Sequence, residues 1–132
     1  MIDAFHDRLA IIDNMLEFVK AKMLGANAFE VHIANHWPEW GVELIDNLVA
    51  GRWEAVHQQY VKQVIPYYIL WQEIQGDFTQ GDGYLDKLCI EAVGLNSSRN
   101  RPPTRDVRPL YLEKAKAMLA ECGTPRVQAP KL

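Results

Sequence analysis

The sequence predicts an α/β chain in which two short parallel strands near the amino terminus precede a long, mostly helical segment. An apolar run at residues 9–12 ends at Asp13, and residues 28–34 alternate between apolar and polar side chains with the period of a strand. A helical pattern separates them, so the first 35 residues have the order of a parallel βαβ unit. From residue 36 onward, apolar residues recur almost throughout at helical spacing.

The connecting helix is expected to begin at Asn14, a favourable N-cap, because Glu17 three positions later completes a capping-box pattern. Gly25 supplies its stop. In the second strand, we expect one face to pack on helices and the other to point away from them. Phe29, Val31 and Ile33 pack on outer helices, while Glu30, His32 and Ala34 point the other way.

Proline and glycine residues mark the ends of the later helices. Pro66 lies inside one of them and should kink it, because proline lacks a backbone donor. The predicted helices run from Pro38 to Gly51, across residues 53–71, across residues 84–92 to Gly94, and from Asp106 to Gly123. The predicted organisation is a βαβ unit at 1–35, a helical extension at 36–123 and a loose tail at 124–132.

Composition excludes several classes of protein. With 132 residues, of which 48% are hydrophobic and 23% charged, the chain is typical of one globular domain. A formal net charge of -3 argues against nucleic acid as a partner, and no apolar run approaches the roughly 20 residues of a membrane span. Cys89 and Cys122 lack CxxC spacing and fall on apolar helix faces, so we expect buried thiols and a cytoplasmic location.

Two parallel strands cannot form a self-sufficient sheet, because both edges would remain unpaired. Parallel strands are normally covered on both faces within a larger α/β sheet. The sequence therefore predicts that these strands belong to a larger barrel, whose other strands lie on another stretch of chain.

Six short stretches, in a fixed order and at characteristic distances, resemble a known family. They are Leu24-Gly25-Ala26 with Ala34-Asn35, Pro38-Glu39, Ala50-Gly51-Arg52-Trp53-Glu54-Ala55, Ile65-Pro66, Asp86-Lys87-Leu88 with Val93-Gly94-Leu95, and Arg101-Pro102-Pro103. From about Arg8 to Pro125, the chain resembles the C-terminal part of the dihydrodipicolinate synthase/N-acetylneuraminate lyase family. These are class I (Schiff-base) aldolases and dehydratases that act on 2-keto acids. The stretch from Asn35 to Trp40 is most similar to the sugar-acid dehydratase-like branches.

The resemblance implies the C-terminal segment of a (β/α)8 TIM barrel, beginning just before the seventh strand, followed by a mostly helical C-terminal extension. In this family the Schiff-base lysine lies on the sixth strand and the relay tyrosine on the fifth, and neither can be placed in this sequence. A Schiff base requires a desolvated, neutral lysine, whereas the lysines here fall on predicted helices or in the tail.

The expectation is therefore a fragment of a lyase that is inactive alone and uses no cofactor, with a 2-keto acid or sugar acid as substrate of the parent enzyme. Its expected partners are the missing N-terminal barrel half or further copies in a homo-oligomer. The alternative is a stand-alone helical interaction or oligomerisation module without catalysis.

Five residues are candidates for the wall of a substrate pocket, and none is assigned as catalytic. Asp13 and Asn14 end the first strand, Asn35 ends the second, and Glu30 and His32 should point into the barrel. Glu30 and His32 could hold a substrate carboxylate or hydroxyl, act as an acid/base pair, or form a hydrogen-bonded pair behind the pocket. Glu30 stands where the family usually has an apolar residue, which points to a different substrate or an inactive branch.

Other side chains receive plainer interpretations. The four histidines show no metal-ligand spacing, so no metal site is predicted. The arginines between residues 99 and 108 are interpreted as a solvated loop, with an anion site as the alternative. The aromatic residues Trp53, Tyr60, Tyr67 and Trp71 are interpreted as helix packing, or equally as a subunit contact.

Overall fold

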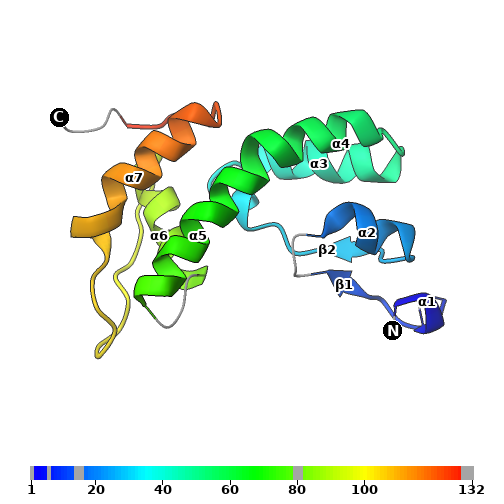
Figure 1. The fold of residues 1–132 in the computed structure, drawn as a ribbon, viewed down its shortest axis with the longest axis horizontal. Helices are drawn as coiled ribbons and strands as arrows, with labels where there is room; N and C mark the ends of the chain where they lie inside the picture. The colour runs from blue at the N-terminus through cyan, green and yellow to red at the C-terminus, as the bar shows by residue number, and fades with distance from the viewer. Residues whose placement is uncertain (1, 6, 14–16, 79–81, 129–132) are drawn as a thin grey trace.

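The computed structural model describes residues 2–5, 7–13, 17–78 and 82–128, and it is mostly helical in these ranges (Figure 1). The amino-terminal elements are α1 (Ile2–Phe5), β1 (Ile12–Asp13), α2 (Phe18–Met23), β2 (Ala28–Phe29) and the 3-10 helix η1 (His32–Asn35). The helices that follow are α3 (Pro38–Val49), α4 (Trp53–Gln59), the π-helical segment η2 (Tyr60–Val64), α5 (Ile65–Asp77), α6 (Asp82–Ala92) and α7 (Arg108–Glu121).

The helices form two packed groups. One long helical segment, made of α4, η2 and α5, takes part in both. α3 and α4 lie antiparallel at one end, and α4 continues through η2 into α5, which crosses the centre of the molecule (Figure 1). At the other end, α6 and α7 pack against each other and against α5. The small strand pair lies beside α2 and α3, away from α6 and α7.

The predicted segment of a (β/α)8 barrel is wrong. In the described part of the chain, the sheet consists of two strands of two residues each, with Ile12 opposite Ala28 and Asp13 opposite Phe29 in parallel register. The alternating stretch at 28–34 is extended only at its beginning, since it turns into η1 from His32 onward. Ile33 is buried where η1 packs against α3, and this tertiary contact outweighs the local strand pattern.

The predicted helix boundaries at proline and glycine are confirmed. Pro38 lies in the first turn of α3, where its missing N–H costs nothing. Gly51, with φ +68°, and Gly94, with φ +81°, adopt the left-handed conformation that ends a helix. The irregularity expected at Pro66 takes the form of the π-helical turn η2, because proline donates no hydrogen bond to the preceding turn.

Other boundaries differ in detail from the prediction. α2 begins at Phe18, and Asn14 lies outside the described residues. α5 extends to Asp77, into the stretch expected to be a loop. Asp106 was expected to cap the last helix, but the N-cap of α7 is Val107. The Asp106 carboxylate, one residue earlier, accepts a hydrogen bond from the Arg108 amide at 3.1 Å. Beyond α7, the Gln128 amide donates to the carbonyl of Ala92 at 2.8 Å.

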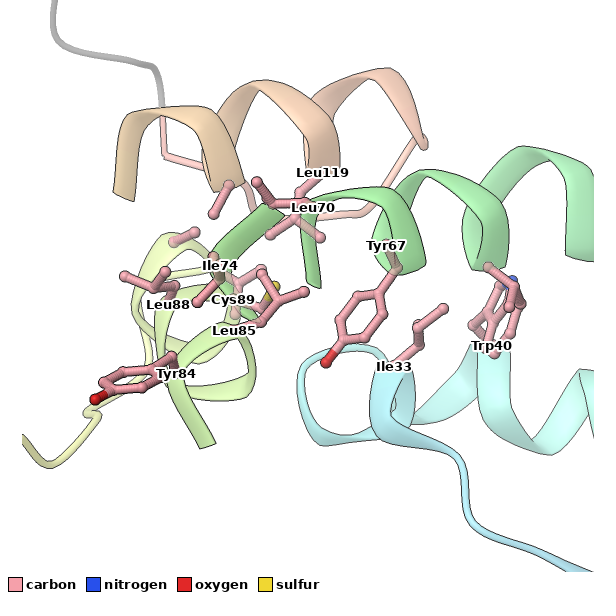
Figure 2. Close-up of a cluster of buried hydrophobic side chains, with 14 of the residues drawn as sticks. Ile33, Trp40, Tyr67, Leu70, Ile74, Tyr84, Leu85, Leu88, Cys89 and Leu119 are labelled. Carbon is pink, nitrogen blue, oxygen red and sulfur yellow. The ribbon is translucent and has the colours of Figure 1, made fainter. Parts of the chain in front are cut away.

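A continuous hydrophobic core joins the two groups of helices. Figure 2 shows its side chains from α5, α6 and α7, among them Leu70, Ile74, Leu85 and Leu119. Both cysteines are buried free thiols, as the sequence predicted. Burial raises the pKa of the Cys122 thiol to about 11.

Candidate functional site

A polar junction lies where η1, α5 and α6 meet. The Asp86 carboxylate on α6 accepts a hydrogen bond from the Tyr67 hydroxyl at 2.6 Å and one from His32 Nδ1 at 3.0 Å. Because the two oxygens of Asp86 are only acceptors, His32 carries a proton on Nδ1 in this arrangement. We call these three residues the His32–Asp86–Tyr67 cluster.

The position of each residue follows from helix packing. Tyr67 is 3% exposed and reaches from α5 toward the segment that contains Ile33 (Figure 2). A buried hydroxyl needs a partner, and an ionised carboxylate is a strong one. The cluster therefore ties the end of the short strand segment to the two helices that form the centre of the core.

The cluster also fixes the orientation of the His32 ring. With Nδ1 bound to Asp86, the opposite nitrogen Nε2 lies 3.9 Å from Glu30 Oε1. The His32 side chain is 20% exposed and the Glu30 side chain is 54% exposed, so this end of the cluster reaches solvent. Chemically, a carboxylate-backed imidazole of this kind can accept or donate a proton at Nε2.

A second histidine lies against the cluster from the inside. The His36 ring stacks on the Tyr67 ring, with a centroid separation of 6.4 Å, and it is 6% exposed. Burial lowers the pKa of His36 to about 4, although the negative charge of Asp86 opposes this effect. Neither ring nitrogen of His36 has a hydrogen-bond partner among the residues that the structure describes.

A small cavity adjoins His36, and it is lined in part by Gln63 and Thr124. Its volume of about 10 Å³ matches the roughly 10–15 Å³ that one water molecule needs. The cavity therefore offers His36 space for a single water molecule, and it is too small for an organic substrate.

The structure brings together only two of the five predicted pocket residues. Glu30 and His32 are neighbours, but they do not point into a barrel interior, since His32 turns toward α5 and α6. Asn35 is exposed in η1. The backbone of Asp13 pairs with Phe29, its side chain lies outside the described residues, and so does Asn14.

The sequence does not reveal the partners that define the cluster. Tyr67 is predicted from the sequence to take part in helix packing or a subunit contact, and Asp86 enters the sequence comparison only within the stretch Asp86-Lys87-Leu88. The two residues lie 35 and 54 positions from His32, and no local spacing connects them. The clue that the sequence did contain is the place of Tyr67 among aromatic residues on the face of a helix that was expected to be buried.

The described lysines lie on helices, at Lys20 and Lys22 in α2, Lys62 in η2, Lys87 in α6, and Lys114 and Lys116 in α7. Lys116 is buried, and its ammonium group pairs with Glu113 at 2.9 Å. A Schiff-base lysine must be open to a ketone, whereas the Lys116 side chain is 5% exposed and contacts a carboxylate.

The described part of the chain contains neither a cluster of metal ligands nor a helix that could span a membrane. In residues 2–5, 7–13, 17–78 and 82–128, no three His, Cys, Asp or Glu side chains gather closely enough to hold a metal ion. None of the helices in the same ranges combines the length and the apolar composition that crossing a bilayer requires. No protein-family model, curated protein or solved structure matches this chain.

Proposed function

We propose that this chain is the carboxyl-terminal, helical portion of a Schiff-base keto-acid lyase or dehydratase similar to dihydrodipicolinate synthase and N-acetylneuraminate lyase. In this proposal the chain packs against the part of the enzyme that bears the reactive lysine, and it has no catalytic activity alone. The ordered series of six sequence stretches supports the proposal, and three of them contain residues that begin or end helices, namely Pro38, Gly51 and Gly94.

The observation that carries the proposal is an open apolar groove along one side of α3. Its lining is formed by Val31, Ala34, Pro38, Gly41, Val42 and Ile45, with Asp46 at the margin. The groove has a volume of about 410 Å³, and Val42 is 63% exposed in it. Contiguous exposed apolar surface of this kind marks a place where another polypeptide packs.

Close packing of α3 on the segment after β2 forms part of the groove wall. A Cβ atom at Gly41 would lie 2.8 Å from the Cβ of Ala34, so only glycine lets α3 approach the segment after β2 this closely. The groove lies next to the strand pair, whose two strands bond only to each other within the described ranges. An apolar groove beside open strand edges is a surface suited to a large apolar partner, such as the remainder of an enzyme.

Binding to that remainder tests the proposal. The amino-terminal part of a family enzyme, ended where the resemblance begins, is immobilised, and the binding of this chain is measured by biolayer interferometry. Val42→Asp should weaken binding at least about tenfold, because it places a charge in a desolvated apolar contact. Ile69→Asp is the matched control, since Ile69 on α5 is 62% exposed and lies outside the groove. Equal binding by both variants, or no binding by the unmodified chain, contradicts the proposal.

A stripe of exposed apolar side chains on η2 and α5 favours a second candidate function, self-association of a helical module. Val61, Ile65 and Ile69 recur every four residues and are 47%, 40% and 62% exposed. Such spacing places the three side chains on one helix face. If Ile69→Asp abolishes a dimer detected by sedimentation while the amino-terminal enzyme part does not bind, the helical module is the correct description.

A further inference from the structure

Another pocket lies between α6 and the segment at residues 99–108. These segments lie at the end of the molecule opposite to α3 (Figure 1). Its volume is about 190 Å³, below the roughly 300 Å³ at which sites for drug-sized ligands begin. Four cationic side chains line it, Lys87, Arg99, Arg105 and Arg108, together with one carboxylate, Asp106. The size suits a small metabolite or an inorganic ion.

The charge of this pocket is opposite to that of the whole chain. Its lining carries a formal charge of +3, since four cations face one carboxylate, and the charge is +2 if Glu91, which pairs with Arg108, is included. The whole chain has a net charge of -3. A concave positive site on an acidic protein concentrates small anions from solution.

Two of the four cations form the framework of the pocket. Arg108 donates to Glu91, to Asp106 at 3.3 Å, and to the carbonyls of Ser97 and Ser98, each at 3.4 Å. Lys87 donates to the side-chain oxygen of Asn100 at 2.5 Å. These bonds hold the loop against α6. They also fix the positive charges of Lys87 and Arg108 in the pocket wall when no ligand is bound.

The other two cations retain binding capacity. Arg99 contacts Asp106 through one nitrogen at 3.3 Å, and the Arg105 guanidinium lies 5.4 Å from the centre of the Phe78 ring. A guanidinium group has five N–H donors, so each of these contacts leaves donors for another acceptor. Two guanidinium forks beside a hydroxyl, that of Thr104, match the several acceptor oxygens of a phosphate group.

We propose that this pocket binds the phosphate group of a small molecule, with Arg99 and Arg105 as the ligand-binding cations. The site is distinct from the His32–Asp86–Tyr67 cluster and from the apolar groove. It does not depend on the proposed function.

Titration of the whole chain with inorganic phosphate, followed by amide chemical shifts, tests this site. We expect saturable shifts at residues 87 and 99–108, and about tenfold weaker binding for Arg105→Gln, since a charge-assisted bond of this kind is worth roughly a factor of ten. Arg101→Gln is the matched control, because Arg101 is exposed in the same loop and does not line the pocket. Its affinity for phosphate should be unchanged.

A parallel titration with glycerol 3-phosphate distinguishes the source of the phosphate group. Tighter binding of the ester assigns the site to a phosphorylated metabolite, and equal binding assigns it to the free ion. Sodium chloride at matched ionic strength should produce no saturable shift. Non-saturating shifts spread over the surface, or equal losses for Arg105→Gln and Arg101→Gln, overturn the proposal.

Discussion

Acidification should destabilise this protein through one buried histidine. His36 is 6% exposed and has a pKa of about 4 in the folded chain, against 6.5 for an ordinary histidine. The unfolded chain therefore binds a proton at this residue more readily than the folded chain. Stability from this source is complete above about pH 6.5, and it is lost as the pH falls toward 4.

The size of the effect follows from the shift. A difference of about 2.5 pKa units, at 1.36 kcal/mol per unit, corresponds to a loss of about 3 kcal/mol between pH 6.5 and pH 4. That is a large fraction of the 5–15 kcal/mol by which typical domains are stable. It is also separable from the titration of carboxylates, because replacing His36 alone removes it.

Urea denaturation followed by tryptophan fluorescence at several pH values measures this contribution. His36→Phe keeps an aromatic ring in the stack on Tyr67 and sacrifices no hydrogen bond among the described residues, so it should flatten the decline in unfolding free energy below about pH 6.5. His57→Phe, at an exposed position in α4, is the control and should keep the decline of the unmodified chain. An equally steep decline in the His36 variant would refute the assignment.

Three further substitutions test the packing of the fold. Asp86→Asn removes the charge of the group that accepts from the Tyr67 hydroxyl and from His32 Nδ1, and it should cost about 1–3 kcal/mol of unfolding free energy in urea; an unchanged midpoint would mean that this charge contributes nothing. Gly41→Ala places a Cβ atom 2.8 Å from that of Ala34 and should cost about 1–3 kcal/mol by thermal denaturation. Gly76→Ala, where a Cβ atom meets nothing within 4 Å, should instead be neutral or stabilising by up to about 1 kcal/mol, and equal losses at both glycines would contradict the packing argument.

The ends of the helices could be predicted because their causes are local. A proline at the first turn, or a glycine with positive φ after the last turn, acts through its own backbone, as at Pro38, Gly51 and Gly94. A kink was predicted at Pro66, and the structure has an irregularity in the turn that precedes this residue. Its form, a π-helical turn, depends on how the chain redistributes hydrogen bonds and could not be read from composition.

The prediction of a strand at residues 28–34 was wrong because the contact that decides the structure, with α3, lies outside this segment. A period of two over a few residues fits an extended strand, and it also fits a chain that is extended for two residues and then turns. Here the amides of His36 and Trp37 donate to the Ile33 carbonyl at 3.2 and 2.9 Å and close the turn before α3. Burial of Ile33 against α3 stabilises the turn.

The candidate site was predictable in part. Glu30 and His32 were predicted to point together into a barrel, and their side chains lie 3.9 Å apart. The carboxylate that orients His32 comes from α6, 54 residues away. The basic pocket shows the same limit. Its arginines lie close together in the sequence and can be recognised there as a group. Lys87 joins them only because the loop packs on α6.

We propose that this chain has no catalytic activity alone, and reductive trapping is the test of that proposal. The chain is incubated with pyruvate and sodium borohydride, alone and together with the lysine-bearing amino-terminal part of a family enzyme, and the lysine adducts are located by peptide mass spectrometry. We predict no adduct on this chain in either sample, and more adduct on the partner when this chain is present. A pyruvate adduct on Lys116, or on any other lysine of this chain, would contradict the account.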